Sequence, residues 1–156
     1  MKQRIYIDTS IVGGYFDEEF KETTNQFFKR FETGKFIFVV SDLLDLELLR
    51  APKRVKNLLF KYPSEYFERV ALTNEAIVLA EKYISEKVVG KTSREDCRHI
   101  ALATINKVDV LASWNFKHIV NLERIRGYNS INIREGYKMI EIRTPKEIFD
   151  YGSNNK

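Results

Sequence analysis

The sequence predicts an α/β domain in three layers, with a mostly parallel central sheet covered by helices on both faces. Short apolar runs, rich in β-branched and aromatic residues, occur at 4–7, 36–40 and 110–112, and longer segments with helical spacing separate them. The run at 36–40 is apolar at every position, which is typical of a strand buried on both faces. Strands that alternate with helices along the whole chain favour a parallel sheet.

Length and composition predict one domain over residues 1–150, followed by a polar, frayed tail at 151–156. The longest apolar run, at 36–40, is too short to cross a bilayer, so we expect no membrane segment. The single cysteine, Cys97, cannot form an internal disulfide, which fits a cytoplasmic protein. Lys and Arg number 26 against 22 Asp and Glu, and this mild basicity permits a nucleic-acid partner without requiring one.

The first strand ends on Asp8, and Gly13 and Gly14 predict a bend before a helix at about 18–31. Ser41 or Asp42 supplies an N-cap for the helix after strand 36–40. The later elements are predicted as a strand at 67–72, a helix from about 74 that ends at Gly90, a helix with a capping box at Thr92 or Ser93, a strand at 110–112, a helix at about 118–126, short strands at 131–133 and 139–142, and a final helical turn at Pro145.

Three acids and one amide occupy corresponding places on this scaffold. Asp8 ends the first strand, Glu47 lies in the second turn of the helix after strand 36–40, and Asn115 lies just beyond strand 110–112. Helices of such a sheet begin near the edge where the strands end, so these side chains share that edge. Asp96, in the first turn of its helix, joins them if the preceding loop brings its helix start to the same edge.

Carboxylates gathered in one cleft repel one another unless a cation is present. Oxygen ligands without a His-rich or Cys-rich pattern favour Mg²⁺ or Mn²⁺ over zinc. The chemistry indicated is metal-dependent hydrolysis of a phosphodiester. Each acid also has a structural interpretation: Asp8 and Asp96 are good helix caps, and Glu47 can pair with Arg50.

Four segments in order resemble the successive motifs of PIN-domain ribonucleases, a family that includes the VapC toxins. They are 5–10 (Ile-Tyr-Ile-Asp-Thr-Ser), 39–48 (Val-Val-Ser-Asp-Leu-Leu-Asp-Leu-Glu-Leu), 96–103 (Asp-Cys-Arg-His-Ile-Ala-Leu-Ala) and 111–115 (Leu-Ala-Ser-Trp-Asn). The resemblance implies an α/β/α sandwich that holds Mg²⁺ or Mn²⁺ with a cluster of acids and cuts RNA. Many members are toxins paired with a small antitoxin, and members often form homodimers.

By this resemblance, Asp8, Glu47 and Asp96 correspond to the three principal acids that hold the metal. Asn115 stands where many members have a fourth acid, and its amide can ligate through oxygen but brings no charge. Three hypotheses stay open. The first is a metal-dependent endoribonuclease, and the second is an RNA-binding or regulatory PIN-like module with weakened catalysis. The third is a flavodoxin-like or receiver-like α/β domain whose acids serve another purpose. Ser10 resembles the hydroxyl residue that holds a metal-bound water, and its alternative role is a helix N-cap.

Several other residues are candidates for contact with RNA. Arg50, Lys53 and Arg54 directly follow Glu47, so this basic segment either receives the RNA backbone or forms a solvated helix face. His118 follows Asn115 by three residues and is a further phosphate contact. Trp114 either stacks on a base or packs in the core. His99, three residues after Asp96, is interpreted as a structural histidine near the site.

Overall fold

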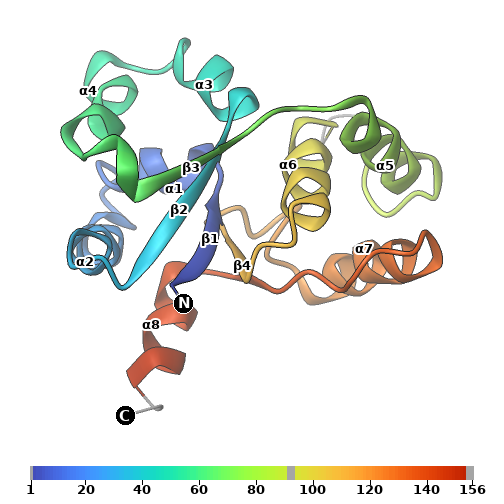
Figure 1. Ribbon diagram of the computed structural model, residues 1–156. Coiled ribbons are helices and arrows are strands. Elements are labelled where there is room, and N and C mark those ends of the chain that lie inside the picture. The colour runs from blue at the N-terminus through green and yellow to red at the C-terminus, as the bar shows by residue number, and fades with distance from the viewer. Residues whose placement is uncertain (1, 91–93, 154–156) are drawn as a thin grey trace.

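The sheet of this protein has five strands in the order β3-β2-β1-β4-β5, and every neighbouring pair is parallel. The structure, a computed structural model, describes residues 2–90 and 94–153 (Figure 1). The predicted α/β fold with a parallel sheet is confirmed. The strands are β1 (Gln3–Ile7), β2 (Phe36–Ser41), β3 (Phe67–Val70), β4 (Val110–Ala112) and β5 (Ile142–Arg143).

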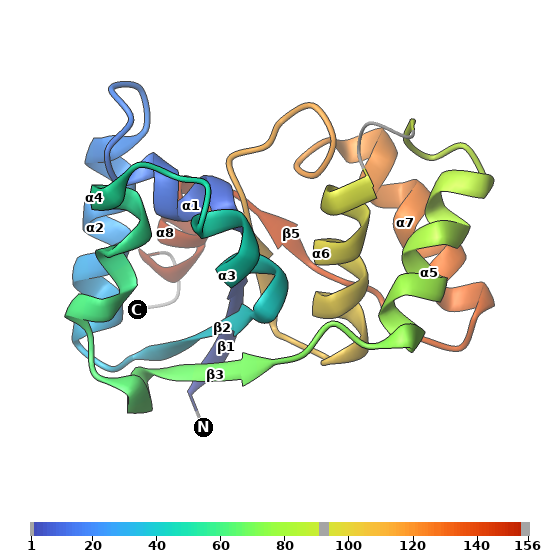
Figure 2. The ribbon, with the colours of Figure 1, turned by 90° about the horizontal axis from the view of Figure 1, so that it is seen from above.

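Helices cover both faces of the sheet, as Figures 1 and 2 show. One face carries α1 (Thr9–Gly14), α2 (Lys21–Glu32), α3 (Asp42–Leu48), α4 (Lys53–Lys56) and α8 (Pro145–Ser153), with the short 3₁₀ helices η1 (Leu58–Lys61) and η2 (Ser64–Tyr66) nearby. The other face carries α5 (Asn74–Ser85), α6 (Arg94–Ile105) and α7 (Leu122–Arg134). In the described part of the chain, no helix combines the length and the apolar character needed to cross a membrane.

Alternate residues of β1 enter two different cores. Tyr6 points into the core shared with α5, α6 and α7, whereas Ile5 and Ile7 point into the core beneath α1, α2 and α8. All three side chains are fully buried. This burial on both faces explains why residues 5–7 of β1 and 36–40 of β2 are continuously apolar.

Most predicted elements are present, with shifted ends. The helix predicted at 18–31 is α2, the strand predicted at 67–72 is β3, and the N-cap predicted at Ser41 is confirmed, since its hydroxyl accepts from Leu44 N at 3.1 Å. The predicted capping box at Thr92 or Ser93 lies outside the described residues. The final helix is longer than the single turn predicted and reaches Ser153, while 154–156 also lie outside the described residues.

Several predictions of local structure are wrong. The strand predicted at 131–133 is part of α7, which begins only at Leu122 because Asn121 caps it. Ile131 is buried there and Ile133 is 58% exposed, so the apparent alternation is one helical turn and not a strand. The helix predicted to end at Gly90 ends at Ser85, and only the end of the 139–142 segment is a strand.

The glycine pair after Asp8 lies inside α1 and not at the predicted bend, and its two members have different surroundings. A Cβ on Gly14 would lie 2.7 Å from Trp114 Cδ1, whereas a Cβ on Gly13 would meet nothing within 4 Å. We expect Gly14→Ala to lower the free energy of unfolding by about 1–3 kcal/mol through overpacking. Gly13→Ala should raise it by up to about 1 kcal/mol through helix propensity. Urea unfolding of both variants checks this, and shifts of the same sign would contradict it.

The order of the strands fixes where a ligand site can form. From β1 the chain moves outward to β2 and β3, then returns to place β4 and β5 on the other side of β1. In open α/β sheets, the crevice at such a reversal lies beyond the carboxyl ends of the two central strands. Here those strands are β1 and β4, and the residues that follow them are Asp8 and Ser113.

Candidate metal centre

Asp8 and Ser113 meet at this crevice because their strands are in register. Ile7 is paired with Ala112, so the residues that follow them, Asp8 and Ser113, lie side by side. The Ser113 hydroxyl donates to Asp8 Oδ2 at 2.6 Å, and the Ser10 hydroxyl donates to Asp8 Oδ1 at 2.6 Å. Burial raises the pKa of Asp8 more than its hydrogen bonds and the nearby His99 lower it. A buried carboxylate of this kind is costly unless a positive charge compensates it.

Asp8 also has its predicted structural role as a helix cap. Its side chain accepts from Ile11 N at 3.3 Å and so caps α1. Ser10 does not act as the cap of this helix, since its hydroxyl is directed at Asp8 and accepts from Trp114 N at 2.9 Å. Capping and ligand binding are compatible, because a carboxylate has about four lone-pair sites.

Asp96 and Asn115 lie in direct contact at the same edge. Asn115 Nδ2 donates to Asp96 Oδ2 at 3.1 Å, and Asn115 Oδ1 accepts from His118 N at 3.0 Å. Burial and then the charge of Asp8 raise the pKa of Asp96 to about 6. Asp96 therefore lies at the same edge as Asp8, as predicted.

Glu47 reaches this edge through a buried histidine. His99 Nε2 is hydrogen-bonded to Glu47 Oε1, and His99 Nδ1 lies 2.6 Å from the hydroxyl of Tyr6, which donates to Ser41 Oγ at 2.9 Å. Burial favours the neutral imidazole and so acts to lower the pKa of His99. The hydrogen bond with Glu47 and the charges of Glu47, Asp8 and Asp96 outweigh this effect, and the pKa of His99 is raised. Burial likewise acts to raise the pKa of Glu47, yet His99 lowers it overall.

The donor set matches a hard divalent cation in type. It consists of carboxylates and an amide oxygen, and the repulsion that raises the pKa of Asp96 is what a cation would relieve. Within residues 2–90 and 94–153, however, no three His, Cys, Asp or Glu side chains are placed together closely enough to hold a metal ion. Each carboxylate is instead engaged by a neighbour, and Glu47 is turned toward His99.

Three buried polar atoms have no hydrogen-bond partner among the described residues. They are Thr9 Oγ1, in the residue after Asp8, Arg98 Nε and His118 Nδ1. Buried polar atoms are normally satisfied, so such exceptions mark places where a ligand or water supplies the partner. Burial and the charges of Arg124 and Lys117 hold the pKa of His118 below its usual value.

The basic segment predicted to bind RNA lies apart from this network. Arg50, Lys53 and Arg54 are exposed at the end of α3 and on α4. Arg50 N donates to the backbone carbonyl of Glu47 at 3.2 Å, but no described hydrogen bond or salt bridge joins the side chains of this segment to the acids, and the Arg54 guanidinium lies 5.2 Å from the ring centroid of Phe16. Trp114 belongs to the core, since it stacks on Phe20 at 4.4 Å and its Nε1 donates to Thr24 Oγ1 at 2.9 Å.

Two residues of the site, Ser113 and His99, were not predicted as functional residues. Ser113 was not a candidate, although its place directly after β4 matches that of Asp8 after β1, and this register was available from the strand pattern. His99 was treated as structural, and it does pack in the core, but it also contacts a predicted ligand. No local signal pairs His99 with Glu47, because the two are 52 residues apart and on different helices.

The fold and this strand order define the class: the chain has a VapC-like PIN-domain fold. No protein-family model matches the sequence, and no curated protein matches it. Among solved structures, it is similar to VapC20 of Mycobacterium tuberculosis, a toxin that cleaves the sarcin-ricin loop, with a TM-score of 0.57 and 12% identity over 72% of this chain and 91% of that one.

Two complexes are similar over most of their length. VapBC2 of Rickettsia felis, bound to a fragment of promoter DNA, gives a TM-score of 0.57 at 11% identity, with 91% of this chain and 98% of that chain covered. FitAcB of Neisseria gonorrhoeae gives 0.56 at 12% identity, with 90% and 97% covered. Identities this low establish the shared fold, so the chemistry of this chain rests on its own residues.

Proposed function

We propose that this chain is a metal-dependent endoribonuclease that hydrolyses RNA phosphodiester bonds and acts as the toxin of a toxin–antitoxin pair. The observation that carries the proposal is the meeting of Asp8, Asp96 and Asn115 at the β1–β4 crevice, with Glu47 joined to them through His99. The fold shared with VapC20, which is itself described as a cleaving toxin, supports the same chemistry.

In this proposal Asp8, Glu47 and Asp96 hold Mg²⁺ or Mn²⁺, and Asn115 completes the site through its amide oxygen. When bound, such a cation polarises a phosphoryl oxygen and lowers the pKa of a water molecule. Ser10 and Ser113 orient the Asp8 carboxylate, and His99 holds Glu47 through Oε1, which leaves Oε2 of Glu47 available to the cation. His118, whose backbone N–H donates to Asn115, supplies a buried ring nitrogen that lacks a partner and can contact the phosphate.

The primary experiment combines cleavage and metal binding. Purified protein is incubated with labelled RNA in Mn²⁺, Mg²⁺ or EDTA, and its melting temperature is followed as Mn²⁺ is added. We expect cleavage only with metal, and stabilisation by Mn²⁺, because binding to the native state adds to stability. Cleavage that is unaffected by EDTA, or the absence of any cleavage, would contradict the proposal.

A second candidate function, an RNA-binding or regulatory module without efficient turnover, is favoured by the neutral Asn115 and by the engagement of Glu47 with His99. It predicts RNA binding without cutting. In that case Asn115→Asp should restore metal-dependent cleavage, since it adds a fourth charge beside Asp96. If the wild-type protein already cuts RNA and Asn115→Asp changes the rate by less than about tenfold, this candidate is excluded.

Asn115→Asp has a stability effect that is independent of activity. The new carboxylate would lie where Asn115 now donates to Asp96, so without metal it replaces a hydrogen bond by repulsion. We expect the free energy of unfolding in EDTA to fall by about 1–3 kcal/mol. Saturating Mn²⁺ should recover most of this loss, and urea unfolding with and without Mn²⁺ measures both quantities.

We further propose a small antitoxin protein as the partner, since the similar VapBC and FitAB structures are antitoxin complexes. A small reading frame next to the gene, and co-purification of its product with this chain, would test the pairing. A homodimer is the oligomer expected from the resemblance, and light scattering of the purified chain tests it.

A further inference from the structure

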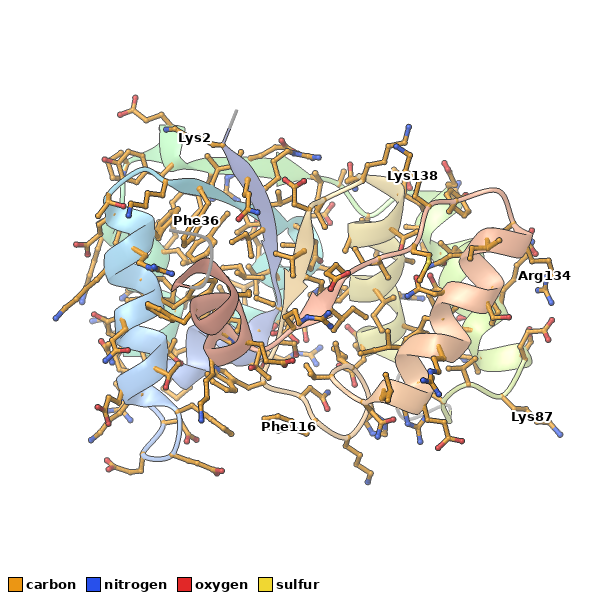
Figure 3. The ribbon with its side chains drawn as sticks, turned by 90° about the horizontal axis from the view of Figure 1, so that it is seen from below. Lys2, Phe36, Lys87, Phe116, Arg134 and Lys138 are labelled. Atoms are coloured by element: carbon orange, nitrogen blue, oxygen red, sulfur yellow. The ribbon has the colours of Figure 1, made fainter. Side chains whose placement is uncertain are left out.

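A polar cleft of about 660 Å³ lies between the chain that follows α5 and the segment that follows Asn115. Figure 3 shows Lys87 and Phe116 at the same edge of the molecule, with Lys2 at the opposite edge. Two acids also line the cleft, but Glu86 is already paired with Arg134 at 3.1 Å. The other lining residues are Lys87, Val88, Lys117, Asn121, Glu123, Arg124 and Gly127.

The walls of this cleft are held by contacts between α7 and Val88. The guanidinium of Arg124 donates to the Val88 carbonyl oxygen, and Asn121 Oδ1 accepts from Arg124 N at 3.2 Å. Gly127 permits the close approach, because a Cβ there would lie 2.9 Å from Val88 Cγ1. The cleft is therefore preformed and needs no rearrangement to receive a ligand.

Lys87 occupies a backbone conformation that favours glycine. Its φ is +64°, and it ends α5 with hydrogen bonds from Lys87 N to Ile84 O at 3.0 Å and from Val88 N to Tyr83 O at 3.1 Å. This is the usual helix-ending arrangement in which glycine is preferred. A lysine here costs stability relative to glycine.

A short turn links the cleft to the candidate metal centre. Asn115, which contacts Asp96, accepts at its carbonyl oxygen from Ile119 N at 3.1 Å and Val120 N at 2.8 Å. These bonds fold the segment after Asn115 into a compact turn, and Lys117 and Asn121 of this turn line the cleft. The lining of the cleft therefore begins two residues after a residue that contacts Asp96.

We propose that this cleft binds phosphates of an RNA strand through Lys87, Lys117 and Arg124. A neighbouring phosphodiester of the same strand then lies at Asp8 and Asp96. This inference rests on the proposed function and names its substrate contacts. The lining is charged and polar, which suits a phosphate backbone and not an apolar ligand. The main contacts with the RNA backbone are thus expected in this cleft and not at Arg50, Lys53 and Arg54.

The test uses glycine at two lysines with the same conformation. Lys107 has φ +53° and ends α6 in the same way, but it lies at the opposite edge, where its carbonyl accepts from Arg4 at 3.1 Å. Both Lys87→Gly and Lys107→Gly should raise the urea midpoint, because glycine relieves the backbone. Only Lys87→Gly should weaken the binding of single-stranded RNA, measured by fluorescence anisotropy in EDTA.

We expect Lys87→Gly to weaken RNA binding about threefold, and Lys87→Gly combined with Lys117→Ala about tenfold at moderate salt. The double variant should also lower the slope of log affinity against log salt by about 1.4, the value for two lost phosphate contacts on a single strand. Loss of affinity in a protein that has become more stable cannot come from misfolding.

Three results would overturn this inference. The double variant could bind RNA as tightly as wild type with an unchanged salt slope, while wild type still cuts RNA in Mn²⁺, so that only the cleft assignment fails. Lys107→Gly could weaken binding as much as Lys87→Gly, which would show a general charge effect. Wild type could neither bind nor cut RNA, in which case the proposed function fails together with the cleft.

Discussion

Asp8→Asn is expected to lower metal-dependent RNA cleavage about a thousandfold, which corresponds to about 4 kcal/mol of lost transition-state stabilisation. Asparagine keeps the shape of the side chain but removes the charge that binds a cation. The fold should tolerate it, because the hydroxyls of Ser10 and Ser113, which now donate to the carboxylate, can rotate to suit the amide. Removing a buried charge also removes its desolvation cost, so the free energy of unfolding should change by less than about 1 kcal/mol.

The matched control is Asp109→Asn, at the edge where the strands begin. The carboxylate of Asp109 accepts from Arg4 N at 2.7 Å and has no contact with the acids at the other edge. This variant should keep both cleavage and the stabilisation by Mn²⁺, whereas Asp8→Asn should lose both. The nuclease proposal fails if Asp8→Asn cuts RNA as fast as the control, or if its melting temperature still rises with Mn²⁺ as in wild type.

The parts of the site that follow strand ends could be predicted from the sequence. Asp8 and Asn115 come after short apolar runs, and parallel strands place such residues at one edge whatever the details of packing. Asp96 needed one further assumption, and its hydrogen bond with Asn115 places it at the same edge. Periodicity and topology were therefore sufficient for Asp8 and Asn115, but not for Asp96, Glu47 or Ser113.

The contacts of Glu47 could not be predicted in this way. Whether α3 directs this side chain at Asp8 or at His99 depends on how α3 and α6 pack, which no local pattern encodes. The same limit explains the wrong strand at 131–133. Ile131 and Asn132 are both buried, and Asn132 accepts from the Tyr83 hydroxyl and donates to Thr104 Oγ1. A buried polar residue satisfied by tertiary contacts gives no apolar signal in the sequence.

His99→Ala is expected to lower the free energy of unfolding by about 2–4 kcal/mol and to reduce RNA cleavage. The imidazole is buried between Tyr6 and Glu47, so its removal leaves a cavity and two polar groups without this partner. Glu47 then loses the contact that holds it near Asp8 and Asp96, and we expect weaker Mn²⁺ binding in a melting-temperature titration. Urea unfolding gives the stability change.

Tyr6→Phe separates packing from positioning. It removes the hydroxyl that contacts His99 and Ser41 but leaves the His99–Glu47 bond in place, so it should cost about 1–2 kcal/mol of stability with Mn²⁺ affinity nearly unchanged. His99→Gln, whose amide can still donate toward Glu47, should recover part of the Mn²⁺ affinity lost in His99→Ala. If His99→Ala and Tyr6→Phe bind Mn²⁺ equally well, then α3 alone orients Glu47, and His99 contributes only to the core.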